Sequence, residues 1–293
     1  MLHYTMIASD ASLLSLLNDW KTRGVTSIAM DFEGEFNLHI YGEHLCLVQI
    51  FDGASYFLID PFKVSPTALK QLFLDPNLEK VMFDCASDAS LLRKQYNVQL
   101  EGVYDVRVSA QLLGYEGNLS GLVARCLKLP PVTGKKGNQK ANWLKRPISP
   151  KLIQYALSDV ENLFAIREVL DRELHKAGLV EKNALLQQSV ALEKRPERPG
   201  WEKLNGYRYL KFEQKIFLKW FFEARDTLAR KLNQPAFRVL DKRKLVELAK
   251  NVPQDSAGFR KIVTHGNSQI EDELVELLLT ARDEAIKELS VTT

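Results

Sequence analysis

Three apolar stretches that lie far apart in this chain carry acidic residues. The first, Ala-Met-Asp-Phe-Glu, contains Asp31 and Glu33, and the second begins at Asp88 in Asp-Ala-Ser-Leu-Leu. The third, Tyr-Ala-Leu-Ser-Asp, runs from Tyr155 to Asp159. Apolar strands and helices are usually buried, and buried carboxylates that approach one another repel unless a cation neutralises them. These stretches therefore favour a fold that gathers four acids and a phenol around divalent cations.

Length and composition favour a soluble protein of two compact units. The chain has 293 residues, of which 45% are hydrophobic, and this is too long for one small core. Its longest apolar runs, such as residues 45–48, are too short to span a bilayer, and no secretory leader is recognisable at its start. The cysteines, Cys46, Cys85 and Cys126, are widely spaced without a C-x-x-C pair. We therefore expect a cytoplasmic protein with reduced thiols, no disulfide partner and no membrane partner.

Positive charge is concentrated in two segments, although the net charge is only +3. No acidic residue lies between Glu116 and Asp159, whereas eight basic residues do: Arg125, Lys128, Lys135, Lys136, Lys140, Lys145, Arg146 and Lys151. From Lys203 to Lys261, fifteen lysines and arginines occur with six acidic residues. Both segments are candidate surfaces for a polyanion such as nucleic acid, and ordinary solvated surface is the alternative for each.

The period of the apolar residues predicts an α/β unit in the first part of the chain. Strands are predicted at 25–30, 45–51, 56–59, 80–83 and 103–106. Helices are predicted at 10–24, at 66–74, at 88–96 and from 151 to about 175. Strands that alternate with helices in this way predict a mixed sheet flanked by helices.

A proline-containing and highly charged segment separates this α/β unit from the C-terminal part. Residues 194–200 contain two prolines, one glycine and four charged residues. Beyond them, apolar residues recur at helical spacing and predict a small all-α bundle. The predicted boundaries are 1–180 for the α/β domain, 181–205 for a helical and proline-containing linker, and 206–293 for the helical domain.

The acids of the first stretch are predicted to share one face of a strand. In a strand, residues two apart point to the same side of the sheet. Asp31 and Glu33 can therefore point into one space, while Met30 and Phe32 pack on the other side.

The remaining acids complete a set that could hold metal. A spacing of four places Tyr155 and Asp159 on one face of a helix, one turn apart, and Asp88 begins its own helix. Four ionised carboxylates can share a pocket when two divalent cations, bridged by Asp31, neutralise them. Two cations about 4 Å apart activate water and stabilise the leaving oxygen of an in-line phosphoryl displacement. The acids therefore indicate phosphodiester cleavage.

The order of these residues along the chain resembles the DEDD superfamily of 3′–5′ exonucleases. Tyr155, four residues before the last acid, is typical of the DEDDy branch, within which the chain resembles the ribonuclease D family over about residues 5–178. Matching stretches are Leu45-Cys-Leu-Val-Gln-Ile, Asn118-Leu-Ser-Gly-Leu and Trp143-Leu-Lys-Arg-Pro-Ile-Ser-Pro. The C-terminal unit is similar to the helicase and RNase D C-terminal (HRDC) domain through residues 222–225, Gln234-Pro-Ala-Phe-Arg-Val-Leu, residues 245–249 and Pro253.

This resemblance implies an RNase H-like fold with two Mg²⁺ or Mn²⁺ ions in the active site. Asp31 is expected to bridge both ions. Glu33 and Asp159 are expected on the ion that activates water, and Asp88 near the other. Tyr155 is expected to orient the attacking water by a hydrogen bond.

The resemblance also implies a polynucleotide partner. Lys140, Lys145 and Arg146 are candidates for gripping the phosphates behind the scissile one. The implied reaction is hydrolysis of RNA 3′ ends, such as those of transfer-RNA precursors, to nucleoside 5′-monophosphates, with the HRDC domain as an accessory nucleic-acid-binding module. Two alternatives stay open: the same chemistry on single-stranded DNA, and a catalytically silent RNA-binding scaffold.

Three residues near the motifs need separate interpretation. Phe83 stands five residues before Asp88, where the family often has a histidine, and Asp84 is an additional acid. Asp84 is interpreted either as a neighbour of the metal site or as a turn or helix-capping acid. Glu35 follows Glu33 on the same face, so it is either close to the metals or an exposed loop acid.

Overall fold

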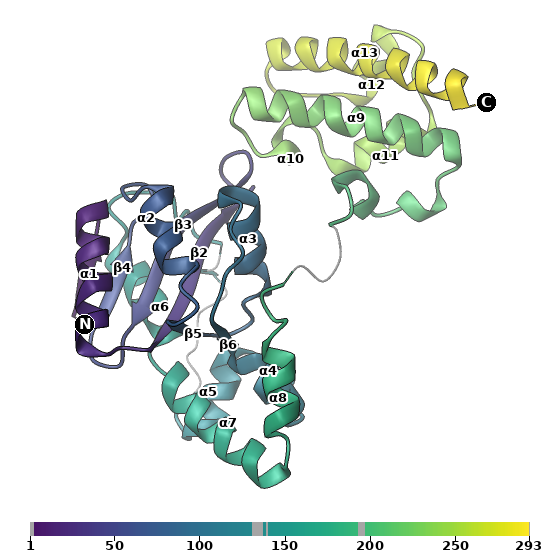
Figure 1. Cartoon of the computed structure of the whole chain (residues 1–293). Coiled ribbons are helices and arrows are strands. Elements are labelled where there is room, and N and C mark those ends of the chain that lie inside the picture. The colour runs from purple at the N-terminus through teal and green to yellow at the C-terminus, as the bar shows by residue number, and fades with distance from the viewer. Residues whose placement is uncertain (1–2, 131–136, 139, 193–196, 293) are drawn as a thin grey trace. The chain divides into compact units, whose positions relative to one another are not determined.

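The computed structural model describes residues 3–130, 137–138, 140–192 and 197–292. The chain forms two compact units, one of Met1–Glu35 with Glu43–Lys194 and the other of Phe36–Gly42 with Arg195–Thr293 (Figure 1). Each unit has its own apolar core. The charged segment 194–200 lies partly outside the described residues, and the predicted domain boundaries stay a prediction.

A six-stranded mixed sheet forms the centre of the first unit. Its strands are β1 (Tyr4–Ile7), β2 (Ser27–Phe36), β3 (Glu43–Phe51), β4 (Tyr56–Ile59), β5 (Glu79–Met82) and β6 (Val103–Asp105). They lie in the order β1-β4-β3-β2-β5-β6. The pairs β1–β4, β2–β5 and β5–β6 are parallel, whereas β3 and β4 are antiparallel. The predicted mixed sheet is confirmed, and β3 and β4 form an antiparallel hairpin.

Helices pack against this sheet, and buried apolar clusters lie between the helices and the strands. They are α1 (Asp10–Arg23), α2 (Pro66–Phe73), α3 (Ala86–Tyr96), α4 (Val106–Leu112), α5 (Leu119–Leu127), α6 (Pro150–Val160), α7 (Leu163–Ala177) and α8 (Val180–Gln187). Trp20 of α1, Phe73 of α2 and Leu92 of α3 belong to one buried cluster. Leu122 of α5 and Ile166 of α7 belong to another.

Strand β2 has two chemically different faces. Met30 and Phe32 lie in the buried cluster formed with α1, α2 and α3. Ala29 lies in the cluster formed with α5 and α7. Because side chains alternate along a strand, Asp31 and Glu33 share the face of Ala29. The packing predicted for Met30 and Phe32 is therefore confirmed.

Two helices replace the single helix that was predicted from residue 151 to about 175. Helix α6 ends at Val160, and α7 begins at Leu163. Asn162 between them has φ −107° and ψ 0°, which is outside the helical region. Asparagine interrupts helices readily because its side chain competes for nearby backbone groups. Strand β1, which was not predicted, pairs with β4 through only four residues.

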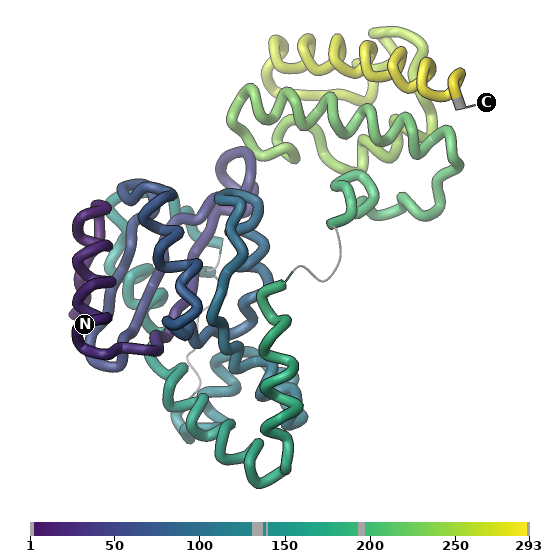
Figure 2. Tube along the Cα trace, in the orientation of Figure 1, coloured from purple at the N-terminus to yellow at the C-terminus, as the bar shows by residue number. Residues whose placement is uncertain are grey.

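The second unit is helical, as predicted. Its elements are two 3₁₀ turns, η2 (Gly200–Lys203) and η3 (Tyr207–Tyr209), and the helices α9 (Phe212–Lys231), α10 (Ala236–Val239), α11 (Lys242–Lys250), α12 (Ser256–Ile262) and α13 (Ser268–Thr292), as Figure 2 traces. Phe221, Leu248, Phe259 and Leu278 are fully buried in its core. In the described ranges of both units, no helix is long and apolar enough to cross a membrane.

Candidate active site

Three carboxylates from two elements meet beside the sheet. Asp31 and Glu33 come from β2, and Asp159 comes from the last turn of α6. One oxygen of each lies within 4.8 Å of the others. Glu33 is 6% exposed and Asp159 is 9% exposed. In the part of the chain that the structure describes, this is the only group of three such side chains with that geometry.

Asp31 lies at the electrostatic centre of this group. Burial raises the pKa of its carboxyl well above the ordinary value, and the charges of Asp88 and Asp159 raise it further. The N–H of Phe32 and the side chain of Gln49 donate hydrogen bonds that act in the opposite direction. Mutual repulsion of this kind is relieved when a cation binds, because carboxylate oxygens are the ligands that Mg²⁺ and Mn²⁺ prefer. The group is therefore chemically suited to hold a divalent cation.

Gln49 is a site residue whose contact was not predicted. It lies in β3 and is fully buried, and its Nε2 donates to Oδ2 of Asp31 at 2.8 Å. Its Oε1 is buried without a hydrogen-bond partner among the described residues. The sequence indicated a polar contact at this position, because Gln49 is the one polar residue in the apolar run of residues 45–51.

Tyr155 lies one helical turn before Asp159 in α6, and its hydroxyl hydrogen-bonds the side chain of Asp159. Its ring is 8% exposed and lies 6.1 Å from the ring of Trp143 between centroids. Burial raises the pKa of the phenol, and the charges of Asp159, Glu33 and Asp31 raise it further. Tyr155 is therefore a neutral hydroxyl at physiological pH, able both to donate and to accept a hydrogen bond.

Asp88 lies in the first turn of α3 and acts on the group through its charge. It is not one of the three carboxylates within 4.8 Å of one another. Its charge nevertheless contributes to the raised pKa of Asp31. Burial, followed by the charges of Asp84 and Asp105, raises the pKa of Asp88 to about 8. The structure thus places Asp31, Glu33 and Asp159 in one group and Asp88 within electrostatic range of it.

The two additional acids have different surroundings. Glu35 is in β2 and only 1% exposed, so the interpretation as an exposed loop acid is wrong: the strand extends further than its apolar run indicated. Asp84 is an exposed turn residue with φ +61° and forms an ion pair with Arg107. It does not cap α3, because the N-cap is Cys85, which makes no side-chain cap hydrogen bond.

Arg146 is occupied by contacts within the first unit. Its guanidinium holds Asp60 through two hydrogen bonds of 2.9 and 3.0 Å. Its other hydrogen bonds go to the backbone carbonyls of Trp143, Lys145 and Cys46. These five bonds equal the five N–H donors of an arginine, so none remains for a phosphate. Arg146 therefore anchors the segment that leads into α6.

The two predicted lysines of this segment differ from Arg146, since Lys140 and Lys145 are both exposed. Exposed ammonium groups remain accessible to a phosphate backbone. Two further lysines of the basic window, Lys135 and Lys136, lie outside the described residues.

Comparison with known proteins identifies the family. A family model described as 3′-5′ exonuclease matches residues 4–175. The chain belongs to the 3′–5′ exonuclease family. Members of this family hydrolyse phosphodiester bonds, so the enzyme class predicted from the acids is confirmed. A second model, the HRDC domain, matches residues 217–281 and confirms the identification of the helical unit.

Relatives of this exonuclease carry the name ribonuclease D. That of Pseudomonas paraeruginosa is 28% identical over 284 residues, covering 94% of this chain and 74% of the relative. That of Haemophilus influenzae is 26% identical over 175 residues, covering 59% of this chain and 43% of the relative. The crystal structure of Escherichia coli RNase D, titled an exoribonuclease involved in structured RNA processing, matches 96% of this chain and 76% of its own with a TM-score of 0.76 and 22% identity. The family resemblance and the RNase H-like fold are confirmed.

Proposed function

We propose that the chain is a two-metal-ion 3′–5′ exoribonuclease that shortens RNA 3′ ends, such as those of transfer-RNA precursors, to nucleoside 5′-monophosphates. The observation that carries this proposal is the group of Asp31, Glu33 and Asp159 within 4.8 Å beside the hydroxyl of Tyr155. The name of the curated relatives supports RNA as the substrate.

The acids would hold two Mg²⁺ or Mn²⁺ ions. Asp31 is the candidate for the shared ligand, because the charges of both Asp88 and Asp159 act on it. Glu33 and Asp159 would complete one site, and Asp88 would contribute to the other. When bound, the ions supply activation of water and stabilisation of the leaving oxygen. Gln49 orients Asp31 by its hydrogen bond to Oδ2.

Tyr155 is proposed to orient the water that attacks the terminal phosphodiester. A neutral phenol can hold a water by a hydrogen bond without removing its proton. Attack at phosphorus forms a new P–O bond and breaks the bond to the 3′ oxygen of the preceding nucleotide. The water loses a proton to solvent, and the 3′ oxygen takes one up from solvent. The phosphate then stays on the 5′ oxygen of the released nucleotide, and the shortened RNA keeps a 3′ hydroxyl.

Phosphates further from the 3′ end are proposed to contact Lys140 and Lys145. Arg146 is revised from a phosphate contact to the anchor of this segment, because its five donors are in use. The HRDC unit is proposed as an accessory nucleic-acid-binding surface, which agrees with its excess of lysine and arginine. The cytoplasmic location expected from the sequence stays a prediction.

Parallel digestion of matched RNA and DNA oligonucleotides tests the proposal. Wild-type protein with Mn²⁺ is expected to shorten 3′-extended RNA one nucleotide at a time, and Asp31→Asn is expected to bind the RNA without shortening it. Wild-type cleavage by Asp31→Asn contradicts the site assignment. Preference for DNA contradicts the RNA assignment alone. A wild-type protein that binds RNA but cleaves neither polymer is the silent scaffold, and its melting temperature is then expected to be independent of Mn²⁺.

A further inference from the structure

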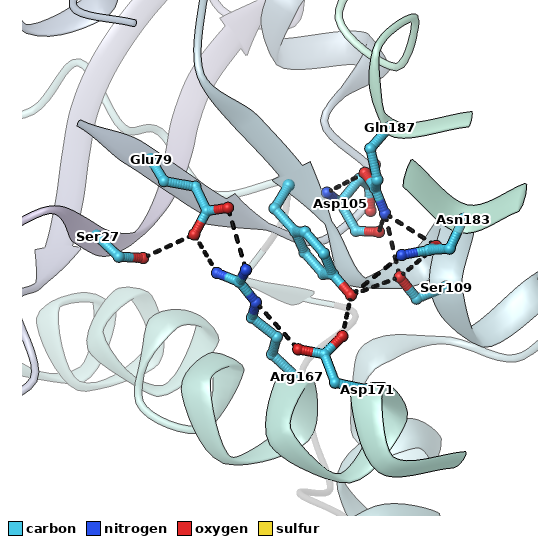
Figure 3. A network of polar contacts seen from close by, with 9 residues as sticks. Ser27, Glu79, Asp105, Ser109, Arg167, Asp171, Asn183 and Gln187 are labelled. Carbon is cyan, nitrogen blue, oxygen red and sulfur yellow. Dashed lines mark hydrogen bonds and ion pairs between the residues drawn. The ribbon is translucent and has the colours of Figure 1, made fainter. Parts of the chain in front are cut away.

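A partly buried polar network lies at the end of β6, and it includes Asp105. Figure 3 shows the network, which extends from Ser27 and Glu79 through Arg167 and Asp171 to Ser109, Asn183, Gln187 and Asp105. Asp105 is 4% exposed and lies where β6 passes into α4. A buried carboxylate with this many partners needs a structural or functional reason, because leaving it unsatisfied would be costly.

The carboxylate of Asp105 binds the backbone that leads into α3. Its Oδ1 accepts from the N–H of Asp84 at 2.9 Å, and its Oδ2 accepts from the N–H of Cys85 at 2.9 Å. Oδ1 also accepts from the N–H of Arg107 at 2.9 Å. Hydrogen bonds to a charged acceptor are about twice as strong as neutral ones. One side chain therefore ties the start of α3 to the start of α4.

These contacts hold the N-cap residue of α3 and the residue before it. The N-cap residue, Cys85, makes no side-chain cap hydrogen bond, and Asp84 before it adopts the left-handed region with φ +61°. The N–H of the N-cap residue is one of the groups that a helix start leaves free, and Asp105 accepts a hydrogen bond from it. The direction in which α3 begins thus depends on Asp105.

Asp88 follows Cys85 by three residues, in the first turn of α3. Any rotation or shift of that turn moves its carboxyl relative to Asp31. Asp105 is also near enough for its charge to contribute to the raised pKa of Asp88. The turn that Asp105 holds is therefore the turn that carries the fourth acid.

Gln187 of α8 holds the backbone of Asp105 in turn. Its Oε1 accepts from the N–H of Asp105 at 2.8 Å, and its Nε2 donates to the carbonyl of Asp105 at 3.0 Å. Nε2 also donates to Oγ of Ser109 at 3.1 Å. Both backbone polar groups of Asp105 are thereby fixed by one amide, as Figure 3 shows.

We propose that Asp105, supported by Gln187, is a positioning residue that sets the place of Asp88 in the metal site by fixing the start of α3. The inference rests on the proposed function, since it requires Asp88 to be a metal ligand. Partners that orient metal ligands typically change metal affinity or activity by 10–100-fold when they are removed. Because Asp105 acts through a helical turn, an effect of about 10-fold is expected.

The test compares Asp105→Asn with Asp171→Asn in the full-length protein. Asn at 105 keeps the size of the side chain but turns one accepting oxygen into a donor, so at least one N–H of the α3 entry loses its partner. Asp171 belongs to the same network, where it accepts from Tyr104 at 2.5 Å and pairs with Arg167 at 3.4 Å, and neither of these partners lies in α3. It therefore controls for general loss of the network.

The measurements are the RNA cleavage rate, taken below the melting temperature of each variant, and the rise in melting temperature on binding Mn²⁺, each followed against Mn²⁺ concentration. Asp105→Asn is expected to need about 10-fold more Mn²⁺ for half-maximal rate, with little change in the KM for RNA. Asp171→Asn is expected to keep the wild-type Mn²⁺ dependence even if it melts at a lower temperature. An unchanged Mn²⁺ dependence in Asp105→Asn, or an equal shift in Asp171→Asn, overturns the proposal.

Two further variants keep the inference testable and separate it from the proposed function. Gln187→Met keeps the side-chain volume and removes both hydrogen bonds to the Asp105 backbone. It is expected to raise the Mn²⁺ concentration for half-maximal rate, but by less than Asp105→Asn does. If Asp105→Asn does not fold, an unchanged Mn²⁺ dependence in Gln187→Met overturns the proposal. Asp88→Asn should abolish cleavage. A wild-type rate in Asp88→Asn refutes the proposed function, whereas an inactive Asp88→Asn with a normal Asp105→Asn refutes only the positioning role.

Discussion

The two units of this chain differ in the charged side chains that they bury. The exonuclease unit gathers Asp31, Glu33 and Asp159 where their charges repel, and Asp88 adds to that repulsion. Among its described residues, the HRDC unit buries one charged side chain, Arg225, whose guanidinium lies 4.5 Å from the centroid of the Phe222 ring. Like charges are thus brought together where a cation would bind, whereas the helical unit has no such group among its described residues.

The largest expected effect is that of Asp31→Asn, which should lower the activity of the exonuclease unit and raise its stability. Asp31→Asn should lower the cleavage rate by about 10³-fold, since preorganised electrostatic groups contribute on this order. In EDTA the same variant should melt about 2–4 °C higher, the shift that 1 kcal/mol gives in a domain of this size, because one repelling charge is gone. Calorimetry and RNA digestion on the same sample measure both. A lower melting temperature in EDTA would show that the acids do not repel in the free protein.

A core substitution in the HRDC unit should instead lower stability and leave the cleavage rate unchanged. Phe259 is fully buried and packs edge-to-face on Phe221 with centroids 5.7 Å apart. Phe259→Ala should therefore destabilise the helical unit by about 3–5 kcal/mol while leaving cleavage of a short RNA unchanged. Phe237, which is 54% exposed, offers the matched control, and Phe237→Ala should cost less than about 0.5 kcal/mol. Loss of cleavage in Phe259→Ala would mean that the two units are energetically coupled.

Removal of the buried phenol should give an intermediate effect. Tyr155→Phe keeps the ring against Trp143 and removes only the hydroxyl that bonds Asp159. A decrease of about 10²-fold in kcat is expected, with normal RNA binding and an unchanged Mn²⁺ dependence. Single-turnover digestion distinguishes this from slow product release. A strong increase in the Mn²⁺ requirement would instead make Tyr155 a determinant of metal binding.

The last expected effect is a dependence of stability on pH in the metal-free protein. The pKa of Asp88 is about 8 in the folded state, against about 3.9 for an unfolded chain. The protonated carboxyl of Asp88 therefore stabilises the folded protein. This contribution is complete when the pH is below the pKa of the unfolded chain, and it is lost as the pH rises through the pKa of the folded protein. The melting temperature in EDTA should fall from pH 5 to pH 8.5, and saturating Mn²⁺ should reduce the fall. Asp88→Asn is the control and should flatten the EDTA curve.

The sequence predicted those parts of the site that depend on local spacing. Asp31 and Glu33 are two residues apart on a strand, and Tyr155 and Asp159 are four apart on a helix, so the period of each element already placed the members of each pair on one face. The alternation of strands and helices likewise predicted the sheet.

Contacts between residues far apart in sequence were missed. Gln49 contacts Asp31 from the next strand, 18 residues away, and Arg146 contacts Asp60 across 86 residues. Whether a polar side chain meets a phosphate, a metal ligand or a backbone carbonyl depends on which segments fold next to each other. Local periodicity carries no information on that choice, and this is why Arg146 was assigned to the substrate.

Strand β2 has a consequence for how such a chain can change over time. Apolar residues and the acids of the candidate site occupy alternate positions along it, so a single inserted residue upstream of Asp31 would slip the ladder by one step. The slip would turn both acids toward the apolar layer beneath α1 to α3, and Met30 toward the face that carries Ala29. A substitution such as Asp31→Asn leaves the register of the strand intact, whereas an insertion or deletion would disturb folding and catalysis in the same event.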